Sequence, residues 1–238
     1  MVFIGLQLRR IAGDRLIDGN VKITISKENY LKAIAEAEAL GEPVIAATVA
    51  RWLDVSAPAV TMATRRLKRD KLIQAGAKGQ LALTPSGRAI ADRILRRHHL
   101  IERMLVELFG MEWYKVHDEA ERLEHAVSED FERLLLKKLG EGKACAHGNE
   151  SEISSPDAMR GRGWQRLDEV VGPVQAIVVS VYERDRGLLE YLDGLSVQPG
   201  ARLEVTGQRG DAVDLRVAGR HVQLPPDTAR KVWVRPEA

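Results

Sequence analysis

The sequence predicts a mainly α-helical protein of α+β class, and three features of the chain indicate this. A short helix, a tight turn and a basic helix near the start are typical of a winged helix-turn-helix domain. Amphipathic segments rich in His and Glu fill the middle of the chain and indicate a second, helical domain. In the C-terminal part, β-branched runs alternate with Gly, Asp or Pro turns, which favours a small antiparallel β-barrel.

Composition places the chain among ordinary globular proteins. It has 238 residues, of which 45% are hydrophobic, enough to bury a core in about two or three small domains. One cysteine excludes an internal disulfide framework, and the sequence has no apolar run of about twenty residues, so we expect a cytoplasmic protein without a membrane segment. In MVFIGLQLRR the positive charges follow the apolar run, which is not the pattern of a signal peptide. Residues 1–21 are expected to be an N-terminal extension, with an early start codon as the alternative.

Residues 22–92 have the pattern of a DNA-binding domain. Helices are expected over 27–40, 45–53 and 59–71, with a turn at 54–58 before the third. Two strand-like runs, LIQAG and QLALT, follow and are separated by Gly and Lys, which predicts a hairpin wing. The alternative is a small protein-interaction domain whose basic helix face is solvated.

The third of these helices has the residue types expected at DNA. Its N-terminal end carries hydroxyl and small apolar groups suited to base edges and thymine methyl groups, and its later basic residues suit phosphates. The candidate base-reading residues are Ser56, Pro58, Ala59, Thr61 and Met62, and the candidate backbone contacts are Arg65, Arg66, Arg69 and Lys78.

Charge changes sign along the chain, although the formal net charge is only +2. Residues 22–97 contain 14 Lys and Arg against 7 Asp and Glu, whereas residues 98–141 contain 6 against 11. The first segment has the sign of a nucleic-acid reader and the second the sign of a cation binder. Chance drift of charge between helical segments is the alternative.

The segment 114–125 is the strongest site signal in the chain. It places His117, Glu121, Glu124 and His125 at i, i+4, i+7 and i+8, so a helix carries all four on one face. An apolar stripe about one residue away lets the same helix pack on a core. Two imidazoles and two carboxylates in register predict a divalent metal site, and the alternative is a charged helix face exposed to solvent.

Further candidate ligands lie nearby in the sequence. Five of the six His residues and the single Cys fall between residues 98 and 147. His98 and Glu102 are again spaced i and i+4 on a helix expected over 87–108, and a Cys145-x-His147 pair follows later. A metal centre built from two helices is therefore the favoured interpretation. The Cys145 and His147 pair alone is a weak signal, for which a buried or incidental thiol is the alternative, and it becomes a candidate second site if it lies within reach of Glu102.

The remaining domain boundaries follow from composition. Residues 93–145 are the expected metal-binding and dimerisation domain, since the helices here have more apolar surface than so small a segment buries internally. Residues 146–164 are the expected linker, within a stretch from Gly140 to Gly163 rich in Gly, Ser and Pro. Residues 165–238 are the expected barrel, in which we find no catalytic set, with Glu183 or Glu190 as minor candidates for a further ligand.

Several motifs together resemble the iron- and manganese-dependent repressors of the diphtheria toxin repressor family. They are ENYLKAI, SAPAVTMATRRLKRDKLI, LTPSGRAIADRILRRHHLIERML, KVHDEAERLEH and CAHGN. The resemblance is close from Ser26 to about Asn149. It extends more loosely to LEYLDGLSVQPGARLEV, which is similar to the SH3-like, FeoA-like domain of longer members.

This resemblance implies a homodimeric transcriptional repressor of manganese or iron homeostasis, with a divalent metal as co-repressor and a palindromic double-stranded DNA operator as partner. The ligands it implies are Asn29, Glu121, Glu124 and His125 for a primary site, with His98 nearby or bridging; His98, Glu102 and His117 for an ancillary site; and Cys145 and His147 for a secondary site.

Three positions in this pattern bear on the metal. Glu121 offers a hard oxygen where iron-type members have sulfur, which favours Mn(II) and leaves Fe(II) as the second choice. Asn29 stands where the family has Asp or Met, so a lower affinity or a broader selectivity is expected. Lys32 stands where some manganese-type members have Glu, which argues against a binuclear site.

Two other functions compete with this interpretation. His117 and Asp118 form an HD pair like that of metal phosphohydrolases, but on a helix Asp118 points about 100° away from His117, and the further ligands of such an enzyme cannot be placed. The second competitor is a winged-helix regulator that does not respond to metal. We expect a protein without enzymatic activity.

Overall fold

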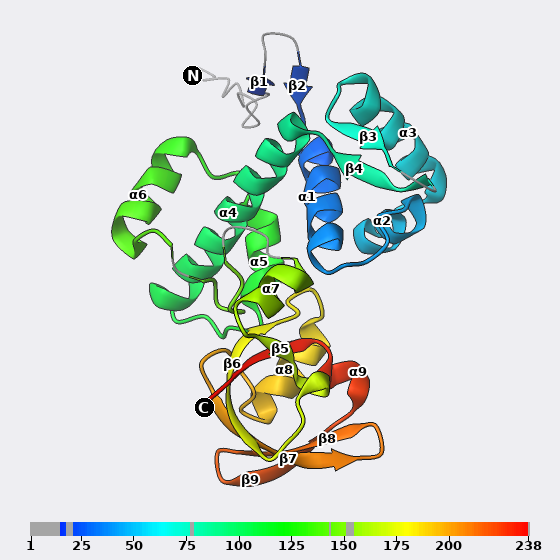
Figure 1. The fold of residues 1–238 in the computed structure, drawn as a ribbon. Helices are drawn as coiled ribbons and strands as arrows, with labels where there is room; N and C mark the ends of the chain where they lie inside the picture. Colours follow the sequence, from blue (N-terminus) through cyan, green and yellow to red (C-terminus); the bar gives the residue numbers. More distant parts are fainter. Residues whose placement is uncertain (1–14, 18–20, 77–78, 143, 151–154, 238) are drawn as a thin grey trace, which may run out of the picture.

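The computed structural model describes residues 15–17, 21–76, 79–142, 144–150 and 155–237. They form a helical part and a C-terminal part built on a six-stranded sheet (Figure 1). Most of the expected N-terminal extension lies outside the described residues, but β1 (Arg15–Ile17) pairs antiparallel with β2 (Val21–Ile23), a hairpin that the sequence did not predict. Within the described ranges no helix is both long and apolar enough to cross a membrane.

The elements of the winged helix-turn-helix are present as predicted. They are α1 (Ile25–Ala39), α2 (Ala46–Leu53), α3 (Ala57–Arg69), β3 (Ile73–Ala75) and β4 (Leu81–Leu83). α2 ends at Asp54, whose left-handed backbone (φ 49°) turns the chain, and Ser56 caps α3 by accepting a hydrogen bond from Ala59 N. α3 therefore begins inside the predicted turn. A single apolar core joins the three helices to the β3–β4 hairpin.

A long helix, α4 (Pro85–Glu107), belongs to two cores. Its first half packs in the winged-helix core through residues such as Ile90, and its second half packs against the following helices through residues such as Ile101. Gly87 permits the first contact, because a Cβ there would lie 1.9 Å from Leu72 O. The predicted domain boundary at residue 92 thus falls inside a single continuous helix.

Two shorter helices complete the helical part. α5 (Val116–Leu123) is shorter than the predicted ligand helix, so Glu124 is its C-cap and His125 lies just beyond it. α6 (Glu129–Leu139) begins at the cap residue Ser128 and packs on α4 through Leu135 and other apolar residues. The four candidate ligands are still carried by one short stretch of chain.

The C-terminal part departs from the prediction in two ways. The expected linker contains a short helix, α7 (Pro156–Gly161), which Ser155 caps. The sheet is open and antiparallel, in the order β5-β10-β6-β7-β8-β9, and is not a closed barrel. Its strands are β5 (Gln165–Arg166), β6 (Val174–Val181), β7 (Arg202–Arg209), β8 (Ala212–Val217), β9 (Arg220–Leu224) and β10 (Val232–Pro236), accompanied by α8 (Arg186–Gly194) and α9 (Pro226–Ala229).

Candidate metal centre and DNA-reading surface

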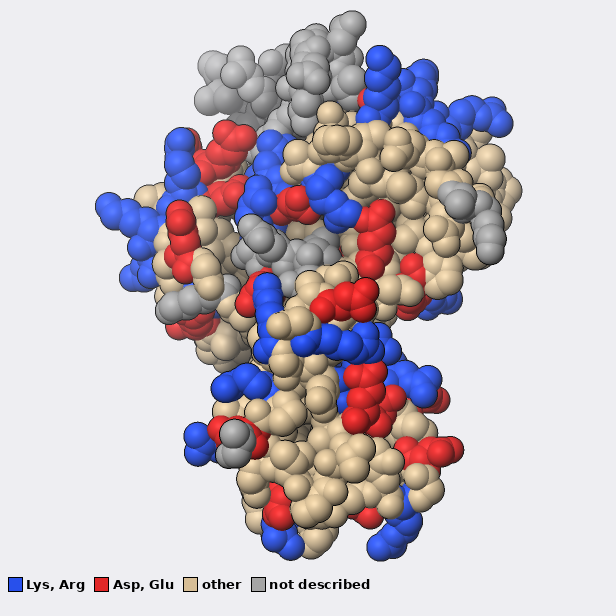
Figure 2. Space-filling view, in the orientation of Figure 1, with Lys and Arg blue, Asp and Glu red and all other residues tan. Residues whose placement is uncertain are grey.

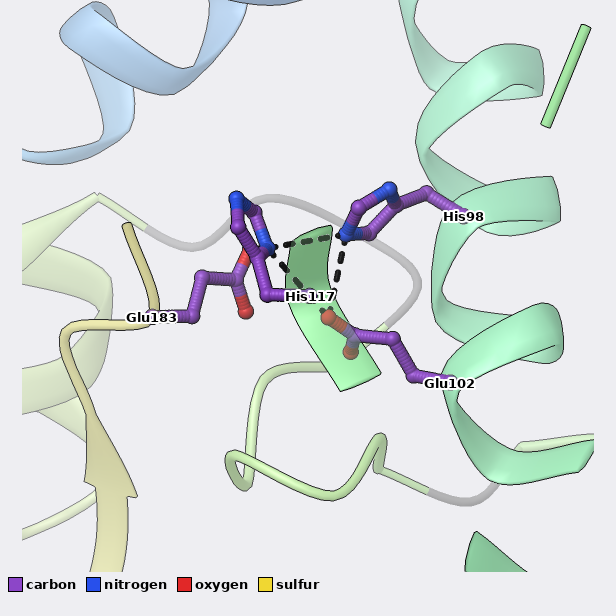
Figure 3. Close-up of side chains that lie close together, drawn as sticks. All are labelled: His98, Glu102, His117 and Glu183. Atoms are coloured by element: carbon purple, nitrogen blue, oxygen red, sulfur yellow. Dashed lines mark hydrogen bonds and ion pairs between the residues drawn. The ribbon is translucent and has the colours of Figure 1, made fainter. Parts of the chain in front are cut away.

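Four side chains from separate parts of the chain meet in one buried cluster (Figure 3). His98 and Glu102 come from α4, His117 comes from α5, and Glu183 follows the end of β6. One potential ligand atom of each lies within 4.8 Å of those of the others. The family resemblance implied the first three as one ancillary site, and the fold brings in Glu183, which was only a minor candidate. We call these four residues the inner cluster.

His98 lies at the centre of the arrangement. Its Nε2 is 3.0 Å from Glu102 Oε1 and 3.0 Å from His117 Nδ1, whereas its Nδ1 is 2.6 Å from Glu124 Oε2. Burial and the nearby Lys32 disfavour the charged imidazolium, but attraction and hydrogen bonds from Glu102 and Glu124 outweigh them and raise the pKa of His98 to about 10. The two ring nitrogens of His98 thus face different candidate ligands: Nε2 faces Glu102 and His117, and Nδ1 faces Glu124.

A second group of possible ligands adjoins the inner cluster. It comprises His99, Glu102, Cys145 and Glu183, again with ligand atoms within 4.8 Å of one another. His147 Nδ1 lies 3.2 Å from Glu102 Oε1, so the structure places both the Cys145 and the His147 side chains within reach of Glu102, the condition on which the sequence made them a candidate second site.

Gly148 explains how the 145–149 turn reaches this position. It has φ +80°, and a Cβ on it would lie 1.9 Å from Val179 O, so the turn can rest directly on β6. Val181 N donates to His147 O at 3.0 Å and fixes the contact. The close approach of the turn to β6 is what brings Cys145 and His147 to Glu183.

The buried atoms of this region suit a divalent cation. Among the described residues, Glu102 Oε2, His147 Nε2 and His99 Nδ1 are buried without a hydrogen-bond partner, which is costly unless an ion or water satisfies them. Burial opposes the charge of Glu102, but His147 and His98 outweigh it and hold its pKa well below the usual range. Two imidazoles and two carboxylates form a donor set that Mn, Fe and Zn all accept.

The Cys145 thiol is a weaker candidate in the metal-free protein. Burial, together with the carboxylates of Glu102 and Glu183, raises the pKa of this thiol well above its ordinary value. The side chain is therefore a neutral thiol unless a cation enters. Oxygen and nitrogen donors dominate the region at neutral pH.

The other predicted ligands gather around Lys32. Glu124 Oε2 accepts from Lys32 Nζ at 2.8 Å, and Glu121 Oε1 lies 3.8 Å from the same nitrogen. Burial disfavours the ammonium, but Glu124, Glu36 and Glu121 outweigh it and raise the pKa of Lys32. Burial also opposes the Glu124 carboxylate, yet Lys32 and His98 lower the pKa of that carboxyl to about 2.

His125 and Asn29 are placed less centrally. His125 Nε2 is 3.4 Å from Glu124 Oε1, while its Nδ1 is 2.9 Å from Glu28 Oε2. Within the described residues no hydrogen bond or ion pair joins Asn29 to this group. Its neighbour on α1, Glu28, makes the contact instead, and sequence reasoning missed it. Asn29 as a metal ligand stays a prediction.

Arg184 connects this region to the DNA-binding elements. Its guanidinium donates to Glu36 Oε2 on α1 at 2.6 Å and to Trp52 O on α2 at 3.2 Å, and it lies 4.9 Å from the centre of the Trp52 ring. Glu121 Oε1 is 3.7 Å away. Because Arg184 directly follows Glu183, adjacent residues contact the inner cluster and the helix-turn-helix.

The predicted DNA contacts lie on an open surface. All of them within the described residues are exposed, namely Ser56, Pro58, Ala59, Thr61, Met62, Arg65, Arg66 and Arg69, whereas Lys78 lies outside the described residues. Figure 2 shows Lys and Arg gathered over the α3 region, at the upper right of the view. Thr61 Oγ1 donates to Ala57 O, so the lone pairs of this hydroxyl remain available to accept a hydrogen bond from a base edge.

Asp118 does not join the ligands. It is 3.7 Å from Arg186 and is partly exposed, whereas His117 points into the inner cluster. The two residues of the HD pair therefore face different surroundings, as the helical spacing predicted.

The winged helix is typical of DNA-binding proteins, and the buried cluster of His and carboxylate side chains is suited to a metal ion. Together they define the class of metal-dependent DNA-binding proteins. Residues 84–152 match the model of the iron dependent repressor, metal binding and dimerisation domain, and residues 165–236 match the FeoA domain. The chain is 34% identical over 219 residues to the iron-dependent repressor IdeR of Mycobacterium tuberculosis, covering 87% of this chain and 95% of that protein. It belongs to the iron-dependent repressor family.

Two further similarities agree with this assignment. The chain is 32% identical over 200 residues to the diphtheria toxin repressor of Corynebacterium jeikeium, covering 75% of this chain and 83% of that one. A solved structure of a manganese-dependent transcriptional repressor in complex with manganese superimposes with a TM-score of 0.79 at 28% identity, covering 89% of this chain and all of that one.

Proposed function

We propose that this protein is a metal-dependent transcriptional repressor of manganese or iron homeostasis, in which a divalent cation favours the DNA-binding form of a homodimer. The observation that carries the proposal is the inner cluster. Its ligands come from α4, α5 and the C-terminal part, and α4 is the same helix that packs in the winged-helix core. A cation held there joins elements that position the DNA-reading helix.

The donor set supports Mn(II), with Fe(II) as the second choice. Glu102 and Glu183 supply hard oxygens, and Glu121 Oε1 lies 3.6 Å from His117 Nε2. The neutral thiol of Cys145 is a poor ligand for the softer metals that prefer thiolate. When bound, the cation supplies positive charge that a carboxylate-rich cluster otherwise obtains only from protonated imidazoles. The pKa of His98 is raised to about 10, so this imidazole must release a proton to bind the cation, and metal binding and proton release are linked.

The link from the inner cluster to DNA runs through Glu183 and Arg184. Glu183 lies among the ligands, and Arg184 contacts α1 and α2. If both contacts are made best in one arrangement of the winged helix, metal and DNA favour the same state and strengthen each other's binding. A coupling of about 1 to 3 kcal/mol corresponds to roughly 5- to 150-fold in DNA affinity.

Exposed apolar side chains supply a dimer surface. Leu108 and Phe109 at the end of α4 are 42% and 73% exposed, and Phe131 and Leu134 on α6 are 42% and 63% exposed. Side chains of this size are rarely left open together on a monomer. A symmetric dimer that buries these side chains would present two winged helices, which suits a palindromic operator.

The test is binding to a palindromic fragment from upstream of a manganese or iron transporter gene, measured by fluorescence anisotropy with Mn(II), Fe(II), Zn(II) or chelator. We expect tight binding only with metal, strongest with Mn(II), and a reduced metal response in Glu124→Ala and Asn29→Ala. Equal binding with chelator would favour the metal-independent regulator. Hydrolysis of nucleotides or phosphodiesters that disappears in His117→Ala would favour the phosphohydrolase.

A further inference from the structure

A buried lysine stands where the primary metal site is predicted. The Lys32 side chain is 4% exposed, and its Nζ is 2.8 Å from Glu124 Oε2, 3.0 Å from His98 Nδ1 and 3.8 Å from Glu121 Oε1. Lys32 Nζ and His98 Nδ1 both lie within hydrogen-bonding distance of Glu124 Oε2, so this oxygen accepts from two donors at once. A lysine this deeply buried needs such partners to stay charged.

The position of Lys32 excludes a metal ion. Bonds from a divalent cation to nitrogen and oxygen ligands are about 2.0 to 2.2 Å long. An ion bonded to the primary-site ligands Glu121 and Glu124 through Oε2, and to His98 Nδ1 as the nearby or bridging imidazole, would lie in the space that the ammonium now fills. Two cations in contact there repel strongly. The ammonium and the metal therefore cannot occupy this site together.

Lys32 faces Nδ1 of His98, whereas the inner cluster is built on the opposite ring nitrogen, Nε2, which contacts Glu102 and His117. The described residues offer two groups of closely spaced ligand atoms, and neither contains Glu121, Glu124 or His125. Lys32 also joins the same two elements that a primary-site metal would join, since it lies on α1 and its partner Glu124 caps α5. In the absence of metal, the lysine already holds these elements together.

We propose that Lys32 is a built-in counter-cation of the primary site, which a metal ion must displace before that site can fill. The inference rests on the proposed function and adds an order to it: the first ion enters the inner cluster, and the primary site fills only at a higher metal concentration. The lysine thereby raises the metal concentration that is needed for the second ion to bind.

The test is isothermal titration calorimetry, which measures the affinity of the full-length protein for Mn(II). We expect wild type to show one tighter and one weaker site per subunit. Lys32→Met should tighten the weaker site by at least about tenfold, that is ~1.4 kcal/mol, and leave the tighter one nearly unchanged. Lys27→Met is the matched control, because Lys27 lies on the same helix but pairs with Asp70, 2.8 Å away.

Thermal unfolding gives a second readout that does not depend on DNA binding. Metal-free Lys32→Met should unfold at a lower temperature than wild type, because Glu124 loses its buried partner, and Mn(II) should restore more of the difference than it does in the control. If Lys32→Met does not fold, Lys32→Gln keeps a donor to Glu124 without the charge and should show the same tightening.

The outcomes separate this inference from the proposed function. Unchanged or weaker Mn(II) binding in a folded Lys32→Met or Lys32→Gln protein overturns the role of Lys32, even when metal still controls DNA binding. Absence of metal binding in wild type and both variants, together with chelator-independent DNA binding, overturns the proposed function as well.

Discussion

Replacing Arg184 by Met should weaken the link between metal and DNA without removing a metal ligand. The substitution keeps much of the side-chain volume over the Trp52 ring but removes the hydrogen bonds to Glu36 Oε2 and to Trp52 O. Glu183, the neighbouring residue, keeps its place in the inner cluster. We therefore expect Mn(II) to bind nearly as before while the winged helix responds less.

The magnitude follows from the burial of the Arg184 contacts. Its side chain is 15% exposed and that of Glu36 is 10% exposed, so solvent screens the pair only partly. A hydrogen bond to a charged group is worth about 1.5 to 3 kcal/mol, and we expect a loss of about 2 to 3 kcal/mol of unfolding free energy. If half of this separates the two states of the winged helix, the metal-driven gain in DNA affinity falls by roughly five- to tenfold.

The assay is operator binding by fluorescence anisotropy with saturating Mn(II) and with chelator, beside calorimetric titration of Mn(II). Arg186→Met is the control, since Arg186 carries the same charge two residues later but pairs only on the surface, with Asp118 and Glu190, among the described residues. A metal-driven gain equal to wild type in a folded Arg184→Met protein would refute the reasoning.

Three further predictions concern the DNA surface, the dimer and pH. Arg66→Ala and Arg69→Ala should each reduce the slope of log affinity against log salt by about one, and unchanged slopes would remove their assignment to phosphates. Leu134→Glu should weaken dimerisation at least about tenfold in sedimentation experiments, because a 63% exposed Leu loses its apolar contact, while an unaltered dimer would place the interface elsewhere. The unfolding free energy of the metal-free protein should be highest between about pH 4.5 and 6.5. The Glu124 contribution is lost as pH falls from 4.5 towards its pKa of about 2, and the His98 contribution is lost as pH rises from 6.5 to its pKa of about 10. Thermal unfolding across this range checks it, and a pH-independent midpoint would contradict it.

Local patterns predicted most of the helical part. Helix spacing placed His98 with Glu102 and His117 with Glu121, because residues four apart share a helix face whatever the tertiary fold. The turn before α3 and the hairpin wing were also readable, since caps, Gly and alternating apolar residues are short-range signals. Element boundaries were less certain, as α5 shows by ending at Leu123.

Long-range contacts were not readable in the same way. Glu183 lies 66 residues after His117 in the chain, and no periodicity relates a residue after a strand to ligands on two helices. The choice between Glu28 and Asn29 depends on how α1 is rotated against α5, and adjacent helical residues differ by about 100° in direction. The open sheet depends on how its edge strands pair, which five strand-like runs cannot specify.

Two adjacent residues of the C-terminal part, Glu183 and Arg184, contact the helical part, although neither belongs to a recognisable sequence motif. In the described residues, Glu183 supplies a carboxylate to the inner cluster, and Arg184 contacts α1 and α2. Of the inner cluster only Glu183 comes from this part, so without it the fourth donor and the Arg184 contact with the helix-turn-helix would both be missing. Under the proposed function, metal affinity and its transmission to DNA should then decline together, because the proposal assigns both to the same short segment after β6.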